Sequence, residues 1–380
     1  KQRQLAALAA KRQHSNDGLF CNSHPRIRVI MVDNARRLVF FEEWMDTDAA
    51  LAKLEAAEDI QVSHLHYTDP KDELDAAMFR AHGYQVQSRT ELQEPWFPNA
   101  EFLTRAPNIV AVSSTGAGYD YIDVDAMTAE GIAVVNQGGT NKESVAEHAL
   151  GMMLAISKKM IQADRRLRRE SNVDRMELTG SELLEKTVGI IGIGQIGTRT
   201  AELCRVAFRM NVIAYDPYLS ADEIAKRGAR KVEFEELLSI SDFISVHCPR
   251  TDETLNMFGA DEFRKMKSTT VFVTTARGGI TDEEALAEAL RNGEILGAGV
   301  DVFWKEPTDP SHPLMALDNV LVTPHHAGIT TEANRNMSVG AADQWISILR
   351  GKRPPRLVNP EVWPAYQLRF ERIMGFRPED

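Results

Sequence analysis

The feature that most constrains this chain is a glycine-rich turn between an apolar run and a helical pattern. Residues 187–191 are mostly apolar, Gly192, Gly194 and Gly197 follow them, and residues 198–208 have a helical pattern. In such a unit one glycine forms the tight turn, one lets the backbone approach a pyrophosphate, and one allows close helix–strand packing. The helix N-terminus then offers unpaired N–H groups and a positive dipole end to the phosphates. The pattern therefore predicts a dinucleotide site.

An aspartate at the end of the next predicted strand supports this interpretation. Asp216 follows residues 212–215 and stands 19 positions after Gly197. A carboxylate at this distance is placed to accept hydrogen bonds from the adenosine ribose hydroxyls. A structural glycine turn with a solvated aspartate is the alternative, and the strand before the turn and the helix after it argue against that alternative.

Two series of short apolar runs, each alternating with helical stretches, predict two parallel sheets. A length of 380 residues also favours two domains. The predicted strands are residues 27–32, 60–65, 84–87, 109–113 and 132–135 in the first series, and 188–191, 212–215, 243–246, 271–274, 299–302 and 320–322 in the second. We predict one long helix over residues 141–169 and a final helix over residues 332–349, which ends before Gly351.

Composition excludes several classes of protein. The net charge of −11 argues against nucleic acid or an anionic membrane as the main partner. Three scattered cysteines, Cys21, Cys204 and Cys248, do not form a disulfide framework or a zinc site, and they favour a cytoplasmic location. Residues 1–14 lack the apolar core of a signal peptide, and no run is long enough to span a membrane.

Three polar residues follow predicted strands of the second series, where ligands of a doubly wound sheet bind. Arg277 is suited to bidentate binding of a carboxylate. His325, if held by the Glu306 carboxylate, could donate a proton to a carbonyl as hydride arrives and take it back in reverse. Taken singly, each has another interpretation: a surface ion pair for Arg277, a solvated loop residue for Glu306, and a core histidine for His325.

From about residue 112 to 328, the chain resembles the D-isomer-specific 2-hydroxyacid dehydrogenase family. The matching blocks are Gly116–Asp120, Ser144–His148, the glycine turn with Asp216, His247–Pro249, Ala276–Gly279, Asp301–Pro307 and Thr323–His325. The resemblance implies an α/β fold of two Rossmann-like, doubly wound parallel-sheet domains. The cofactor domain, residues 140–330, would be inserted into a discontinuous substrate domain of residues 1–139 and 331–380, with residues 141–169 and 332–349 as hinges.

The resemblance also implies roles for individual residues. Arg277 would bind the substrate carboxylate and carbonyl, Glu306 would orient His325 and favour its protonated form, and His325 would be the acid/base. Backbone N–H groups of Gly116, Ala117 and Gly118 would bind the substrate carboxylate. The residues expected to contact NAD are Gly192, Gly194, Gln195, Ile196, Gly197, Asp216, Cys248, Pro249, Thr254, Thr275, Ala276, Asp301 and His325, with Asp301 near the nicotinamide amide.

Several positions depart from the family pattern. His326 replaces a usual apolar residue, and it is a second, weaker candidate for the acid/base. Gln87 stands where relatives often carry a substrate-facing arginine, which disfavours a phosphorylated or doubly anionic substrate. Trp96 and Trp304 either line the site or pack elsewhere, with surface packing favoured for Trp96.

The expected activity is hydride transfer between NAD(H) and C2 of a small D-2-hydroxy or 2-oxo acid. A formate- or phosphite-type dehydrogenase on the same fold is one alternative, although formate enzymes carry Gln where Glu306 stands. An NADH-sensing binding protein of the family's corepressor branch is the other. No metal is expected, because no His, Cys or Asp cluster has metal-ligand spacing. A homodimer is expected, because residues 141–169 carry more apolar residues than one buried stripe requires: Ala149, Leu150, Met152, Met153, Leu154 and Ile156.

Overall fold

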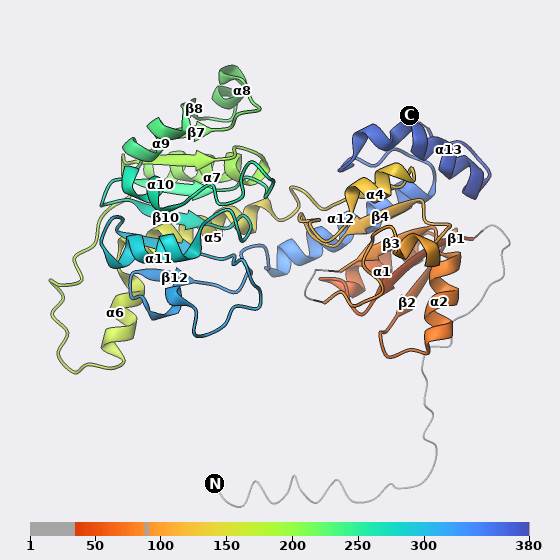
Figure 1. Ribbon diagram of the computed structural model, residues 1–380, viewed down its shortest axis with the longest axis horizontal. Helices are drawn as coiled ribbons and strands as arrows, with labels where there is room; N and C mark the ends of the chain where they lie inside the picture. Colours follow the sequence, from red (N-terminus) through yellow and green to blue (C-terminus); the bar gives the residue numbers. More distant parts are fainter. Residues whose placement is uncertain (1–34, 88–90, 380) are drawn as a thin grey trace, which may run out of the picture. The chain divides into compact units, whose positions relative to one another are not determined.

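The computed structural model describes residues 35–87 and 91–379 (Figure 1). The strand predicted over residues 27–32, Cys21, and the expectation for residues 1–14 lie outside these ranges. Within them the chain forms two parallel sheets, each covered by helices on both faces. Two doubly wound α/β domains were predicted, and this is confirmed.

The second half of the chain forms a seven-stranded sheet in which every pair of neighbours is parallel. Its strands are β6 (Thr187–Ile191), β7 (Asn211–Tyr215), β8 (Arg230–Lys231), β9 (Phe243–Val246), β10 (Val271–Thr274), β11 (Gly297–Val300) and β12 (Val320–Val322). The order is β12-β11-β10-β9-β6-β7-β8. The direction of strand addition therefore reverses between β6 and β9, which is where a doubly wound sheet binds its ligand.

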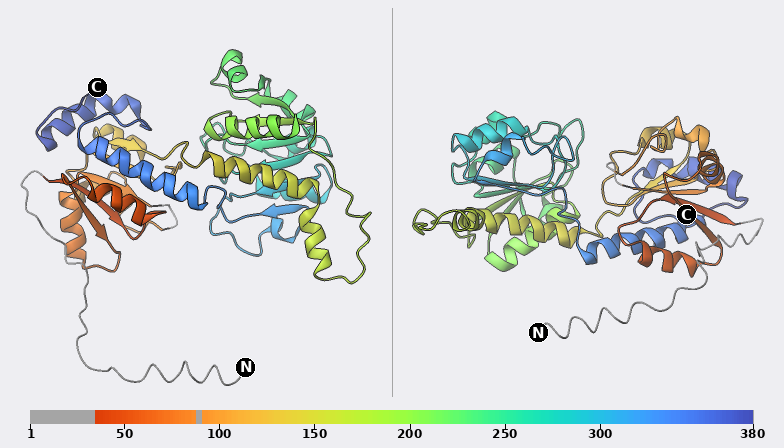
Figure 2. Two further views of the ribbon diagram at one scale, coloured as in Figure 1. Left: turned by 180° about the vertical axis from the view of Figure 1, so that it is seen from behind. Right: turned by 90° about the horizontal axis from the view of Figure 1, so that it is seen from below.

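Helices cover both faces of this sheet. One core contains apolar residues of α5 (Lys142–Ser157), α7 (Gln195–Phe208) and α8 (Ala221–Lys226), and α5 and α7 lie side by side on that face (Figure 2). The other core contains residues of α9 (Phe234–Ile240), α10 (Ala260–Lys265), α11 (Glu283–Arg291) and the 3₁₀ turn η1 (Pro313–Ala316). Burial on both faces explains why the strands read as continuous apolar runs in the sequence.

The first half of the chain forms a five-stranded parallel sheet of order β2-β1-β3-β4-β5. Its strands are β1 (Arg36–Phe41), β2 (Ile60–Leu65), β3 (Gly83–Val86), β4 (Ala111–Ser114) and β5 (Ala133–Val135). This order is that of flavodoxin-like sheets, which also place their ligands beyond the carboxyl ends of the strands.

Helices from the C-terminal part of the chain pack on the five-stranded sheet. One face of the five-stranded sheet packs on α1 (Thr47–Glu55), α12 (Thr331–Leu349) and α13 (Trp363–Met374), which follows the 3₁₀ turn η2 (Pro360–Val362). The other face packs on α2 (Lys71–Arg80), α3 (Phe102–Arg105) and α4 (Val124–Ala129). Trp345 of α12 is fully buried against Gly83 of β3, where any side chain larger than hydrogen would overlap the indole ring.

Two structural expectations were incomplete or wrong. The single helix predicted over residues 141–169 is two helices, α5 and α6 (Met160–Leu167), because Lys159 between them has left-handed backbone dihedrals with φ of 51°. Alternation of apolar and polar residues did not reveal β1, the two-residue β8 or α13. None of the helices within the described ranges is both long and apolar enough to span a bilayer.

Most of the apolar residues of α5 pack inside the domain. Ala149, Met152, Met153 and Ile156 are core residues, and Leu150 and Leu154 pack against the same core. The helix needs this many apolar residues because it contacts β10 and β11 on one side and α7 on another. Leu150 and Leu154 remain partly exposed, and the homodimer stays a prediction.

Candidate active site

The glycine turn lies at the point where the strand order reverses, between β6 and α7. Gly192 has φ of 81°, and a Cβ there would lie 2.7 Å from the backbone N of Cys248, so both backbone and space require glycine. Gly194 is the N-cap of α7, and a Cβ there would meet no atom within 4 Å. The space above Gly194 is thus open beside the N–H groups of the first helical turn, as a pyrophosphate requires.

The predicted ribose-binding aspartate lies against this turn. Asp216 follows β7, and its carboxylate accepts hydrogen bonds from the backbone N–H of Ile193 at 3.2 Å and of Tyr218 at 3.2 Å. The other expected cofactor residues follow neighbouring strands. Cys248 and Pro249 come after β9, and Thr275 and Ala276 come after β10. These segments and the glycine turn therefore meet at one edge of the sheet.

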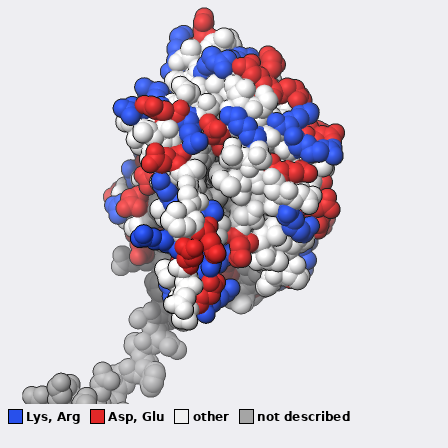
Figure 3. All heavy atoms as spheres, turned by 90° about the vertical axis from the view of Figure 1, so that its left-hand side faces the viewer, with Lys and Arg blue, Asp and Glu red and all other residues white. Residues whose placement is uncertain are grey.

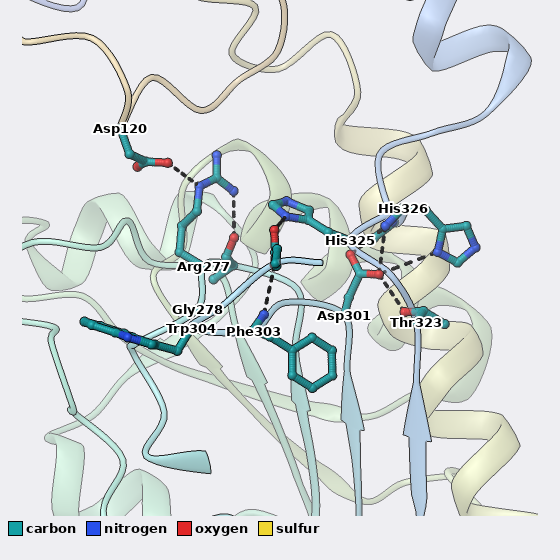
Figure 4. A network of polar contacts seen from close by, with 12 residues as sticks. Asp120, Arg277, Gly278, Asp301, Phe303, Trp304, Thr323, His325 and His326 are labelled. Carbon is teal, nitrogen blue, oxygen red and sulfur yellow. Dashed lines mark hydrogen bonds and ion pairs between the residues drawn. The ribbon is translucent and has the colours of Figure 1, made fainter. Parts of the chain in front are cut away.

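His325 and Glu306 form the expected pair (Figure 4). Nδ1 of His325 lies 2.8 Å from Oε2 of Glu306, and Oε1 of the same carboxylate accepts a hydrogen bond from the backbone N–H of Phe303 at 2.9 Å. A carboxylate that faces Nδ1 fixes the proton there and leaves Nε2 for a ligand. The His325 side chain as a whole is 41% exposed.

Hydrogen bonds to Glu306 determine its protonation state. Burial of the carboxyl group opposes its ionisation. The hydrogen bonds from His325 and from the Phe303 N–H, together with the charges of His325 and Arg277, outweigh burial and lower the pKa of Glu306. Glu306 is therefore a carboxylate at neutral pH, which is the form that stabilises an imidazolium.

Arg277 extends from the loop after β10 toward Asp120 (Figure 4). Its Nη1 donates to the carbonyl oxygen of Ala276 at 2.7 Å, and its Nε donates to Asp120 at 3.1 Å. Nη2 lies so close to Gly118 that a side chain at position 118 would overlap it. Three backbone N–H groups, those of residues 116–118, were expected to bind a carboxylate. The N–H of Gly116 donates a hydrogen bond to the Ser114 hydroxyl at 3.3 Å.

Asp301 orients the loop that carries His325. It is fully buried at the end of β11, and its backbone carbonyl accepts the N–H of His325 at 2.7 Å. Its carboxylate accepts the N–H groups of His326 and Ala327, each at 3.0 Å, and the hydroxyl of Thr323 at 2.6 Å. His325 has φ of 51°, and these contacts hold it in that uncommon backbone conformation.

His326 points toward Asp301, with Nδ1 3.6 Å from Oδ1 (Figure 4). Nε2 of His148 lies 3.2 Å from the Thr323 hydroxyl. Within the described ranges, His148, Asp301 and His326 are one group of three side chains that could bind a metal ion. Sequence spacing gave no signal for this group, because its members come from three elements far apart in the chain.

The other three positions singled out in the sequence, Gln87, Trp96 and Trp304, have different surroundings. The Gln87 amide is buried and donates to the carbonyl oxygens of Phe41 and Glu43. Trp96 is a buried core residue whose ring packs beside Phe41, so the preference for surface packing was wrong. Trp304 is 64% exposed and lies against Gly279, in the loop between Asp301 and Glu306.

Comparisons with known proteins agree with this geometry. Residues 150–327 match the model of the NAD binding domain of D-isomer specific 2-hydroxyacid dehydrogenases. A glyoxylate reductase of Thermofilum pendens is 38% identical over 268 residues, which cover 70% of this chain and 79% of that protein. A D-3-phosphoglycerate dehydrogenase of Archaeoglobus fulgidus is 41% identical over 292 residues, covering 77% of this chain and 53% of that one.

A solved structure is also similar. The D-lactate dehydrogenase of Aquifex aeolicus, complexed with NAD and lactic acid, aligns with a TM-score of 0.69 and 28% identity over 83% of this chain and 96% of that chain. The fold and the glycine turn define a dinucleotide-binding α/β protein whose ligand edge carries a carboxylate-held histidine. The chain belongs to the D-isomer-specific 2-hydroxyacid dehydrogenase family. It spans about half the length of the phosphoglycerate dehydrogenases that it matches.

Proposed function

We propose that this chain is an NAD-dependent dehydrogenase acting on C2 of a small D-2-hydroxy or 2-oxo acid. The observation that carries the proposal is the His325–Glu306 pair, 2.8 Å apart, in the same domain as the open glycine turn. A dinucleotide fold alone supports many reactions. A histidine whose proton is controlled by a neighbouring carboxylate adds the acid/base that carbonyl reduction requires.

The nicotinamide cofactor supplies or accepts the hydride at C2 of the acid. In reduction, Nε2 of His325 donates a proton to the carbonyl oxygen, and in oxidation it takes the proton from the hydroxyl. Glu306 stabilises the imidazolium form of His325 through Nδ1. Arg277 and the backbone N–H groups of residues 116–118 bind the carboxylate of the acid, and arginine suits this because its planar fork matches a carboxylate.

NAD is the proposed dinucleotide. The open space at Gly194 fits the pyrophosphate, and the Asp216 carboxylate beside the turn fits free ribose hydroxyls. The phosphate of NADP would approach this carboxylate and be repelled. Thr254 supports the loop after β9 by donating from its hydroxyl to the Pro249 carbonyl at 2.7 Å. Asp301 would lie near the nicotinamide amide.

The proposed cofactor domain is residues 140–330, and residues 1–139 and 331–380 form the proposed substrate domain. The two sheets support this division, since β1–β5 form one and β6–β12 the other. We also propose a homodimer. Its support comes from apolar side chains on α6 and the segment after it, which are exposed by 44–69%: Met160, Leu167, Met176 and Leu184.

Surface charge and thiols support two further parts of the proposal. On the face shown in Figure 3, Lys and Arg side chains alternate with Asp and Glu side chains and form no continuous basic surface. This favours a small-molecule ligand over nucleic acid. Cys204 and Cys248 are free, which fits a reducing cytoplasm.

One assay panel tests the activity. Purified chain is mixed with NADH and glyoxylate, hydroxypyruvate, phosphohydroxypyruvate or longer 2-oxo acids, and loss of NADH absorbance is followed. Turnover of at least one acid supports the proposal. Tight NADH binding without turnover of any acid would instead support the NADH-sensing protein. Oxidation of formate or phosphite, with no reaction of the 2-oxo acids, would support a formate- or phosphite-type dehydrogenase.

A further inference from the structure

We propose that His148, Asp301 and His326 form a zinc-binding site whose occupancy excludes the nicotinamide end of the cofactor. The three side chains come from α5, the end of β11 and the loop before α12. Their ligand atoms, His148 Nε2, Asp301 Oδ1 and His326 Nδ1, all lie within 4.8 Å of one another. Two imidazoles and one carboxylate are a ligand set that zinc commonly uses, and such a set leaves a fourth position for water.

The distances fit a site that closes slightly on the ion. Asp301 Oδ1 lies 4.0 Å from His148 Nε2 and 3.6 Å from His326 Nδ1. Zinc bonds of about 2.1 Å in a tetrahedron place neighbouring ligand atoms about 3.4 Å apart. Asp301 and His326 would approach each other slightly, and the two imidazoles, within 4.8 Å of each other, would close by at most about 1.4 Å. The His326 side chain is 45% exposed and can make this movement.

The Asp301 carboxylate is already held in one orientation, as a metal ligand requires. Its side chain is 1% exposed, and two backbone N–H groups orient the carboxylate. In metal sites, hydrogen bonds to the ligating side chains hold those side chains in the orientation that the ion requires. The Thr323 hydroxyl, now 2.6 Å from Oδ1, would give up that hydrogen bond to the ion. The two imidazole rings already meet edge to face, with centroids 5.0 Å apart.

Packing alone accounts for only part of this arrangement. His148 has a hydrogen bond to Thr323, so its ring has a structural role without a metal. The His326 ring is half-exposed and packs edge to face on His148, and its Nδ1 lies 3.6 Å from Asp301, which is ion-pair distance but beyond hydrogen-bond distance. Its orientation toward a buried carboxylate, rather than toward water, is the observation that favours a shared ligand.

Occupancy would have a functional consequence that rests on the proposed function. Asp301 is the residue proposed to lie near the nicotinamide amide, so an ion on its carboxylate would occupy that space. The ion would also alter the loop that carries His325, because Asp301 accepts the His325 N–H. Zinc should therefore inhibit in competition with NADH.

The direct test needs no turnover. Zn²⁺ is titrated into the full chain, freed of cofactor, by isothermal calorimetry, and Co²⁺ is used as a spectroscopic probe through its visible absorption. We expect one ion per chain, and at least tenfold weaker binding in His326→Ala and in His148→Ala. His66→Ala is the matched control, since this histidine pairs with Glu42 on the five-stranded sheet, and its binding should equal that of the unmodified chain.

The outcomes distinguish failure of the zinc site from failure of the proposed dehydrogenase function. If His148→Ala fails to fold, His326→Ala decides, because its side chain is half-exposed. No binding of Zn²⁺ at micromolar concentration, or binding that both variants retain, would overturn the zinc site. Zinc binding that saturating NADH does not weaken would overturn the overlap with the cofactor. Neither result depends on whether any 2-oxo acid is reduced.

Discussion

His325 Nδ1 lies 2.8 Å from Glu306 Oε2, and the backbone N–H of His325 lies 2.7 Å from the carbonyl oxygen of Asp301. Side chain and backbone of the histidine are therefore fixed by two different acidic residues. Glu306 determines which ring nitrogen carries the proton, and Asp301 determines where the ring points.

Replacement of the histidine tests the acid/base role. His325→Ala should lose about 10²–10⁴-fold in the rate of 2-oxo acid reduction, the usual contribution of general acid–base catalysis, and should still bind NADH. His326→Ala is the matched control and should lose far less in the absence of zinc, because His326 faces Asp301 rather than Glu306. Steady-state rates and NADH fluorescence titration measure both. If His326→Ala is the crippled variant, the assignment is wrong.

The pH profile tests Glu306. Because its pKa is lowered, Glu306 is ionised across the neutral range, and its negative charge favours the protonated form of His325. Reduction needs that form, so in Glu306→Gln the rate should decline at lower pH than in the unmodified chain. The rate of reduction is measured from pH 5 to 9 under saturating NADH. An unmoved profile would contradict the proposed proton control.

Cofactor preference tests Asp216. Like charges at about 4 Å repel by about 4 kcal/mol at an effective dielectric near 20, so the 2′-phosphate of NADP should reduce catalytic efficiency roughly a thousandfold. Asp216→Ala should relax this preference. The measurement is kcat/KM with NADH and NADPH for both proteins. Equal efficiency in the unmodified chain would contradict the role given to the carboxylate.

Two alanine substitutions in one turn test the reason for its glycines. Gly192→Ala should lower the melting temperature, because the residue has φ of 81° and a Cβ would lie 2.7 Å from the Cys248 N. Gly194→Ala should fold normally, because its Cβ meets nothing within 4 Å, yet it should bind NADH more weakly by filling the open space. Thermal unfolding and NADH titration of both variants distinguish backbone strain from ligand exclusion.

Stability in mild acid tests the state of His247. Removal from water lowers the pKa of this histidine to about 3, below its ordinary value of 6.5. The unfolded chain therefore binds one proton more than the folded chain between these values. The free energy of unfolding should fall by up to about 1.4 kcal/mol per pH unit as pH decreases below 6.5.

Denaturant unfolding of His247→Asn supplies the comparison. This variant should show a shallower decline of stability with pH, because the buried titrating group is gone. Partial solvent exposure of His247 makes the stated slope an upper limit. An identical decline in both proteins would show that other groups are responsible.

Local sequence determined much of this protein. The apolar runs of β9 and β10 correspond to strands because both are buried on both faces of a parallel sheet. The edge strands β2 and β12 are only partly buried, and all four strands match their predicted bounds residue for residue. The sequence also revealed the cofactor site. The φ of 81° at Gly192 is a local property of the backbone that favours glycine, so the turn is visible in the sequence. The expected pairing of Glu306 with His325 came from the family resemblance, and the structure has the two in contact.

Tertiary structure decided what depends on neighbours from elsewhere in the chain. β1 has charged residues at its start and no alternation, and it is a central strand because β2 and β3 pair with it. The apolar residues of α5 suggested an exposed face, and only packing against two strands and α7 shows that they are internal. The convergence of His148, Asp301 and His326 has no sequence signature, because side-chain proximity between separate elements is fixed by the order of strands and not by spacing along the chain.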